Sequence, residues 1–134
     1  MSTPVTIGFD IGGTNMRAGA ITEAGNIIDS TATEAPHDAD ELQEGIVRIV
    51  NKFRADHCIG AVGLAIAGFL DPDCEIVRFA PHLPWRDRHA RAELQAALGV
   101  PVRLEHDANA AAWGEYKFGG AQGHDNWVLF ALGT

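Results

Sequence analysis

A carboxylate followed by two glycines is the first feature of the sequence that could do chemistry. Asp10 ends an apolar segment and is followed by Gly12, Gly13, Thr14 and Asn15. Glycines let a backbone turn sharply and approach a ligand closely, and the N–H groups of such a turn can point at phosphate oxygens. The carboxylate could hold a hydrated Mg²⁺ beside those oxygens. Two glycines between apolar strands also make an ordinary hairpin turn, and the pattern is neither GxxxxGKS/T nor GxGxxG. The spacing alone therefore leaves a phosphate loop and a plain turn both open.

A second carboxylate, Asp107, lies where a predicted strand gives way to a predicted helix. Asp is a preferred helix N-cap, so a structural role would account for it. A carboxylate near a transferring phosphate can also act as the general base for a hydroxyl group. The alanines at 108 and 110–112 are small enough for this helix to pack close to a sheet. Without further information, the N-cap is the simpler interpretation.

Gly68 and Phe69 follow a strongly apolar segment and could contact a ligand. A glycine after a buried strand can expose backbone groups, and Phe69 and Trp85 could stack on the apolar face of a sugar ring. A turn with buried aromatic side chains explains the same residues, and composition alone favours that interpretation.

The hydrophobic pattern predicts an α/β domain in which these residues follow strands. Residues 5–10, 16–22 and 27–33 predict a three-stranded meander, with turns at 11–15 and 23–26. Apolar residues at helical spacing predict an amphipathic helix over 38–57, and the apolar run 59–67 predicts a strand buried on both faces. A helix between two such strands is a crossover connection. The remaining predictions are an irregular segment at 68–84 with a short strand at 75–79, a helix at 86–98, a strand at 100–105, a helix at 107–118, a loop at 119–125 and a final strand at 126–132.

Composition and charge narrow the class of protein. The 134 residues fit one domain, and the net charge of −8 opposes binding of nucleic acid through a broad basic face. It does not oppose ATP, because a few local amides and a metal ion can hold its phosphates. Cys58 and Cys74 form no CxxC or zinc spacing and are expected to be reduced thiols. Because the first six residues carry no signal and no apolar stretch approaches the ~18–20 residues of a membrane span, a cytoplasmic protein without a membrane partner is expected.

Five motifs, taken in order, resemble those of the ROK family (repressors, open reading frames and kinases). DIGGTNMR at 10–17 resembles the phosphate-1 motif DxGGTxxR, and GLAIAGFLD at 63–71 resembles GxAxPGxVD. APHLPWRD at 80–87 resembles APNLPWRD, and EHDANAAAWGE at 105–115 resembles the helix ENDANAAAxGE. ALGT at 131–134 resembles the start of the phosphate-2 motif LGTGIGGG. The resemblance covers essentially the whole chain, and the bacterial ATP-dependent glucokinase group is the most similar part of the family.

The resemblance implies a fold and an activity. The fold would be that of the actin-like (ribonuclease H-like) ATPases, a mixed sheet opened by the meander, with helices packed on it and a nucleotide between two lobes. Residues 1–134 would be the N-terminal lobe, and the C-terminal lobe would be absent from this chain. The full-length protein would be an enzyme that transfers phosphate from ATP to a hexose, with glucose as the leading substrate. One lobe cannot close around its substrates, so this chain alone is expected to be nearly inactive.

The resemblance also assigns roles to single residues. Asp107 would take the proton from the sugar 6-hydroxyl as the catalytic base, and Asp10 would help to place Mg²⁺. The phosphates of ATP would contact Asp10, Gly12, Gly13, Thr14, Asn15, Gly133 and Thr134. The sugar would contact Gly68, Phe69, His106 and Asp107.

The sequence departs from the family pattern at three positions. His106 and His82 each stand where the family has an Asn, and Ala67 stands where it has a Pro. The Asn that His106 replaces binds the sugar in the family, and an imidazole can donate one hydrogen bond and accept another but with a different reach from an amide, so the sugar preference and affinity are left open. The changes at 82 and 67 are expected only to tune the site. The rest of the phosphate-2 loop, the adenosine site, the ExGH-type sugar ligands and a Cys-rich structural zinc motif would belong to the second lobe.

Two other functions compete with the kinase lobe. A ROK transcriptional regulator carries a helix-turn-helix segment before the kinase-like domain, and a strand that begins by residue 5 leaves no room for one here. A non-catalytic sugar- or phosphate-binding module would need no second lobe. The sequence favours the kinase, and it leaves open mannose, fructose or an N-acetylated sugar as the acceptor, polyphosphate as the donor, and a homodimer as the assembly.

Overall fold

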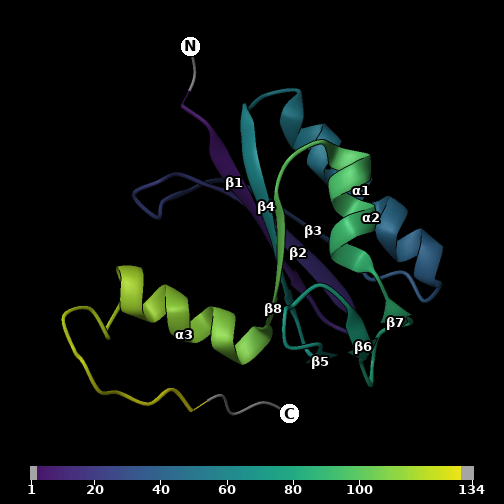
Figure 1. Cartoon of the computed structure of the whole chain (residues 1–134). Helices are drawn as coiled ribbons and strands as arrows, with labels where there is room; N and C mark the ends of the chain where they lie inside the picture. The colour runs from purple at the N-terminus through teal and green to yellow at the C-terminus, as the bar shows by residue number, and fades with distance from the viewer. Residues whose placement is uncertain (1–2, 131–134) are drawn as a thin grey trace.

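The computed structural model describes residues 3–130 and shows a five-stranded mixed sheet between helices (Figure 1). The antiparallel meander comprises β1 (Val5–Ile11), β2 (Asn15–Ile21) and β3 (Ile27–Glu34). Two later strands, β4 (Ile59–Ile66) and β8 (Val102–His106), run parallel to β1, and the order across the sheet is β3-β2-β1-β4-β8. The predicted α/β fold with its opening meander is confirmed.

Helices α1 (Ala39–Arg54) and α2 (Ala90–Leu98) lie side by side on one face of this sheet (Figure 1). Alternate residues of the strands point into the core beneath them, and Ile7 and Leu104 are fully buried there. Asp38 is the N-cap of α1, because its carboxylate accepts hydrogen bonds from the Asp40 and Glu41 N–H groups at 3.0 and 3.1 Å.

The other face of the sheet carries α3 (Asp107–Phe118), which leaves directly from the end of β8 (Figure 1). Small residues form a row across this face, since Gly8 pairs with Gly19 on one side and with Gly63 on the other. The helix covers only part of the face, and 61% of Trp113 is exposed. The helix bounds at 107 and 118 agree with the prediction.

A second, three-stranded sheet replaces part of the segment that was predicted to be irregular. It comprises β5 (Phe69–Leu70), β6 (Val77–Phe79) and β7 (Arg86–Arg88). The prediction of a helix from residue 86 is wrong at its start, because β7 pairs with β6 and Asp87 has a positive φ of 47°. The helix begins only at Ala90.

Ion pairs hold this small sheet against the helices. The Arg88 guanidinium lies 2.9 Å from an Asp40 carboxylate oxygen on α1 and 2.9 Å from a Glu93 carboxylate oxygen on α2. The same side chain also donates to the Gln43 side-chain oxygen at 3.0 Å. The position of the small sheet relative to the large one is therefore fixed by charged contacts as well as by packing.

Asp71 closes the turn between β5 and β6 and supplies a pH-dependent prediction. Its Oδ1 accepts hydrogen bonds from the Ile76 and Glu75 N–H groups at 2.8 and 2.7 Å, and these bonds, led by that from Ile76, hold its pKa below the ordinary value of 3.8. A carboxyl group with a lowered pKa stabilises the fold above its unfolded pKa, and this contribution is lost as the pH falls through the folded pKa. We expect Asp71→Asn to lower Tm at neutral pH, with a difference from wild type that shrinks below pH 3.8.

Thermal unfolding between pH 7 and pH 2 measures this difference. Asp73→Asn is the matched control, because Asp73 is exposed in the same turn and accepts no hydrogen bond from the described residues. A difference between wild type and Asp71→Asn that grows on acidification would contradict the assignment.

The predicted final strand at 126–132 is wrong where it can be compared. Residues 126–130 form no strand, and residues 131–132 lie outside the described part of the chain. Val128 and Phe130 are 74% and 83% exposed, while Trp127 stacks on Tyr116 of α3 with ring centroids 6.2 Å apart. A strand requires a neighbouring strand for its N–H and C=O groups, and none of the strands in residues 3–130 pairs with this segment.

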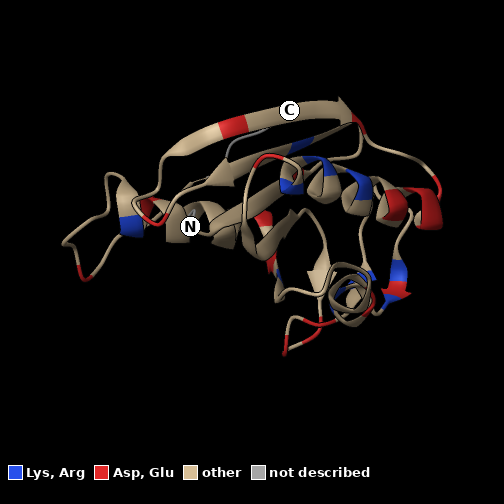
Figure 2. Ribbon diagram, turned by 90° about the horizontal axis from the view of Figure 1, so that it is seen from above, with Lys and Arg blue, Asp and Glu red and all other residues tan. Residues whose placement is uncertain are grey.

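The surface charges are mixed in sign. Figure 2 shows basic and acidic residues interspersed along the helices and loops, with the described strands mostly free of charge in that view. None of the helices in residues 3–130 has the length and apolar character that a membrane crossing requires.

Candidate functional site

Three segments singled out from the sequence meet at one edge of the large sheet. Strands β1, β4 and β8 are parallel, and their registers place Ile11 opposite Ile66 and Ile66 opposite His106. The residues that follow each strand therefore emerge at the same carboxyl edge. Since neighbouring strands lie about 4.8 Å apart, the ends of β1 and β8 are separated by roughly 10 Å. This places the Gly12–Gly13 turn, Gly68 and Asp107 within the reach of one ligand.

The turn after β1 is a tight hairpin at this edge. The Gly12 N–H donates to the Asn15 carbonyl oxygen at 2.9 Å, and the Thr14 carbonyl oxygen accepts from the Ala35 N–H at 2.9 Å. The predicted turn at 11–15 is shorter in the structure, because Ile11 belongs to β1, where it pairs with Met16, and Asn15 belongs to β2, where it pairs with Glu34 of β3. The two interpretations of this segment, a plain hairpin turn and a phosphate loop, are thus compatible, since the hairpin turn lies at the same sheet edge as Gly68 and Asp107.

Asp10 lies on the exposed side of β1, one residue before this turn. It faces Arg17 across the hairpin, and both side chains line a shallow hollow on the α3 side of the sheet. Residues 3–130 contain no group of three His, Cys, Asp or Glu side chains that could hold a metal ion. A single exposed carboxylate suits Mg²⁺ that keeps its waters and shares phosphate oxygens, which is the common way in which proteins hold this ion with a nucleotide.

Gly68 lies against the small sheet with no space for a side chain. A Cβ atom placed on it would lie 2.8 Å from the Phe79 carbonyl oxygen and 2.9 Å from Ala80 Cβ. The next residue, Phe69, is 66% exposed and could stack on a ligand. The idea that Trp85 could do the same is wrong, because Trp85 is 1% exposed and its indole N–H donates to the Ala39 carbonyl oxygen at 3.1 Å.

His106 and Asp107 share the start of α3. His106 is the N-cap, since its Nδ1 accepts from the Ala108 N–H at 3.2 Å, and Asp107 is the first residue of the helix. Asp107 Oδ1 accepts from the same N–H at 2.8 Å, while its Oδ2 makes no hydrogen bond within residues 3–130. Both side chains are nearly half exposed. One carboxylate oxygen therefore supports the helix, and the other is available to a substrate hydroxyl.

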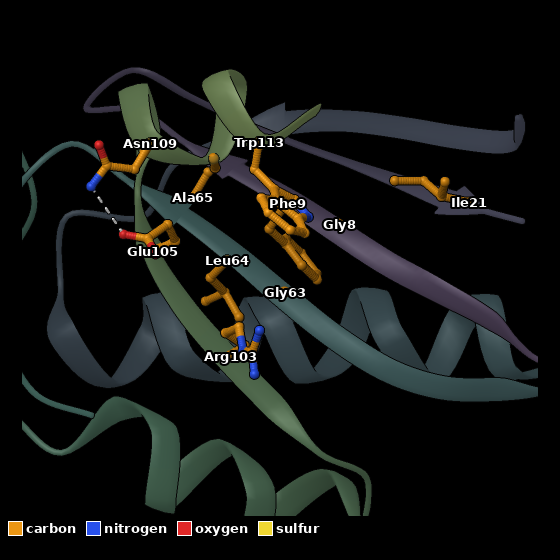
Figure 3. Close-up of a pocket in the computed structure, with 11 residues that line it drawn as sticks. Gly8, Phe9, Ile21, Gly63, Leu64, Ala65, Arg103, Glu105, Asn109 and Trp113 are labelled. Atoms are coloured by element: carbon orange, nitrogen blue, oxygen red, sulfur yellow. Dashed lines mark hydrogen bonds between the residues drawn. The ribbon is translucent and has the colours of Figure 1, made fainter. Parts of the chain in front are cut away.

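Glu105 and Asn109 brace this helix start, and neither was predicted to be a site residue. Glu105 Oε1 accepts from the His106 N–H at 2.9 Å and from the Asn109 amide at 3.3 Å, and Figure 3 shows the second of these bonds. The four-residue spacing, which puts both side chains on one side of the strand-to-helix junction, was the available signal. These bonds fix the backbone that carries Asp107.

The hollow drawn in Figure 3 lies beside the predicted site and does not contain it. Its lining includes Gly8, Gly63 and Trp113 but none of the predicted site residues, and it comes near them only through Glu105 and Asn109, which flank His106 and Asp107 in the chain. Two predicted phosphate ligands, Gly133 and Thr134, lie outside the described residues.

Comparison with known proteins supplies the family. The model of the ROK family matches residues 6–134. A glucokinase of Streptomyces coelicolor is 43% identical over 130 residues, which are 97% of this chain and 41% of that protein. The crystal structure of a ROK family glucokinase from Streptomyces griseus, in complex with glucose and AMPPNP, superimposes with a TM-score of 0.85 at 41% identity over 90% of this chain and 39% of that one.

A regulator is also similar to part of the chain. The xylose repressor of Bacillus subtilis is 40% identical over 73 residues, which are 54% of this chain and 19% of that protein. The chain spans about 41% of the length of the Streptomyces coelicolor glucokinase. With a family match over nearly every residue and the fold of a solved relative, the chain belongs to the ROK family.

Proposed function

We infer that this chain is the N-terminal lobe of an ATP-dependent hexose kinase, with glucose as its first substrate. The observation that carries the proposal is the convergence of the Gly12–Gly13 turn and Asp107 at the carboxyl edge of β1, β4 and β8. Phosphoryl transfer depends on positioning and on neutralising charge, and these residues offer both. The similarity to a glucokinase that binds glucose and AMPPNP supports the same assignment.

Asp107 would act as the general base of the reaction. Its Oδ2 would accept the proton of the sugar 6-hydroxyl as the hydroxyl oxygen attacks the γ-phosphorus and ADP leaves. The hydrogen bond from the Ala108 N–H to Oδ1, at 2.8 Å, would hold the carboxylate in place during the transfer. Gly68, Phe69 and His106 would orient the sugar.

The donor phosphates would lie on the turn after β1. The backbone N–H groups of Gly13 and Thr14, with the Asn15 side chain, would contact them. The Gly12 N–H would keep the turn closed through its hydrogen bond to the Asn15 carbonyl oxygen, so that its backbone lies beside the phosphates, and Asp10 would hold Mg²⁺ through its waters. Mg²⁺, when bound, neutralises charge on the phosphates. Gly133 and Thr134 would extend this contact from the C-terminal end of the chain.

A second lobe would complete the site in the full-length protein. It would supply the adenosine site, further sugar ligands and the structural zinc, and closure of two lobes would exclude water. This chain alone is expected to bind ligands weakly and to transfer little phosphate. A cytoplasmic location and a place at the start of glucose breakdown belong to the same proposal, because the reaction consumes ATP and yields a phosphorylated hexose.

A steady-state assay of phosphorylated-sugar formation by the full-length protein tests the kinase. Glucose, mannose, fructose and N-acetylglucosamine are each offered with ATP, and glucose is offered again with polyphosphate. We expect the highest kcat/KM for glucose with ATP. The absence of a phosphorylated sugar in every combination would refute the proposal.

A sugar-responsive regulator is the second candidate, because the xylose repressor is similar over half of this chain. A regulator would bind sugar, release no ADP and bind DNA in a sugar-dependent manner. A binding module without catalysis would bind sugar alone. Calorimetry with glucose and a DNA-retention assay on the same preparation separate the three functions.

A further inference from the structure

The turn formed by residues 80–83 lies between the two halves of the candidate site. A Cβ atom on Gly13 would lie 2.6 Å from His82 Cβ and 3.1 Å from the His82 carbonyl oxygen. On the other side, Gly68 approaches Phe79 and Ala80. The phosphate turn therefore packs against His82, and the predicted sugar segment packs against the residues just before it.

A hydrogen bond within the turn and buried neighbouring residues fix the backbone of this turn. The Leu83 N–H donates to the Ala80 carbonyl oxygen at 3.2 Å, and Ala80 is 2% exposed. Trp85, two residues after the turn, is buried in the core, and its indole N–H donates a hydrogen bond to the Ala39 carbonyl oxygen at the start of α1. His82 cannot move far from Gly13 without disturbing these buried contacts.

The side chain of His82 leaves the backbone beside the Gly12–Gly13 turn, where the phosphate donor ATP would bind. The atoms nearest to a Cβ on Gly13 include His82 Cβ and, at 3.5 Å, His82 Cγ, whereas the atoms nearest to Gly68 belong to Phe79 and Ala80. His82 is exposed, and its imidazole makes no hydrogen bond or ion pair within residues 3–130. An imidazole carries at least one N–H donor, and phosphate oxygens accept the stronger, charge-assisted hydrogen bonds.

We propose that His82 is a nucleotide-binding residue whose imidazole N–H donates a hydrogen bond to a phosphate oxygen of ATP on the Gly12–Gly13 turn. The inference rests on the proposed function, which places the donor phosphates at that turn. His82 would then contact ATP, the phosphate donor. It belongs to the segment between β4 and α2, and the same segment carries the predicted sugar contacts Gly68 and Phe69. One segment of the backbone would therefore contact both substrates, with His82 on the ATP phosphates and Gly68 and Phe69 on the sugar.

Two binding measurements on the full-length protein test this assignment. Calorimetry gives Kd for AMPPNP with Mg²⁺ and, separately, Kd for glucose in wild type, His82→Ala, His82→Asn and His89→Ala. We expect His82→Ala to raise Kd for AMPPNP about tenfold, the scale of one hydrogen bond to a charged group, and to leave Kd for glucose at the wild-type value. His82→Asn keeps an N–H donor and should retain part of the affinity. His89→Ala removes another exposed imidazole, at the start of α2, and should change neither value.

Three outcomes would overturn the assignment. Weaker glucose binding with unchanged AMPPNP binding would place His82 on the sugar side, and wild-type values for both ligands would show that it contacts neither. If His82→Ala does not fold, His82→Leu and His82→Asn decide, and equal Kd values for AMPPNP in these two variants would also overturn it. A wild-type protein that binds both ligands but transfers no phosphate refutes the kinase alone, so the two failures are distinguishable.

Discussion

Replacing Asp107 by Asn in the full-length protein is expected to lower kcat by about 10²–10⁴-fold, the usual contribution of a general base. An amide cannot take a proton from the sugar hydroxyl, whereas its oxygen can still accept from the Ala108 N–H as Oδ1 does at 2.8 Å. The start of α3 should therefore stay folded, and Kd for glucose should change little. Steady-state kinetics and calorimetry on the same preparation measure the two quantities.

The matched control for this variant is Asp73→Asn. It removes an exposed carboxylate from the turn after β5 and should leave kcat unchanged. Turnover retained by Asp107→Asn would exclude Asp107 as the base and would return it to a purely structural role at the helix start.

Replacing Gly13 by Ala is expected to destabilise the full-length protein by about 1–3 kcal/mol, the range for a side chain forced into a packed site. The new methyl group would lie 2.6 Å from His82 Cβ, an atom that cannot move without its backbone. Either the phosphate turn or the turn at 80–83 must shift, so KM for ATP should also rise. Thermal unfolding and kinetics with varied ATP measure both effects.

Two further variants separate this collision from a general intolerance of alanine. Gly63→Ala is the control, because a Cβ atom there has no heavy atom within 4 Å among the described residues, and its Tm should not fall. The double variant Gly13→Ala, His82→Gly removes the 2.6 Å contact and leaves the one at 3.1 Å to the carbonyl oxygen, so part of the lost Tm should return. The same Tm loss with and without the His82 side chain would contradict the steric explanation.

Local patterns predicted most of the fold because local physics determines it. The amphipathic spacing predicted α1, and the apolar run from residue 59 predicted β4, each to within a few residues. The prediction of a helix from residue 86 was wrong at its start because β7 depends on pairing with β6 and on the positive φ of Asp87. Neither can be predicted from the local sequence pattern. The strand predicted over residues 126–132 failed over 126–130, the part that the structure describes, because a β pattern forms a strand only beside a partner.

The candidate site divides in the same way. Asp10, the glycine turn and Asp107 were named from residue type and position, since a carboxylate or a glycine after a strand carries a chemical meaning of its own. Whether they could act together was decided by the parallel register of β1, β4 and β8, which aligns their carboxyl ends at one edge. Trp85 shows the reverse, because its aromatic character suggested a sugar contact until packing buried it.

The sequence by itself determined which residues have the chemistry for phosphoryl transfer and, through the order of the motifs, the family to which they belong. Only the tertiary structure decided that His82 lies against Gly13, that His106 caps α3, and that Glu105 and Asn109 brace it. Hydrophobic periodicity and turn chemistry act between residues close in the chain, so they can be read along it. Contacts such as that between residues 13 and 82 arise when distant strands pair and pack, and they follow from the geometry of the sheet.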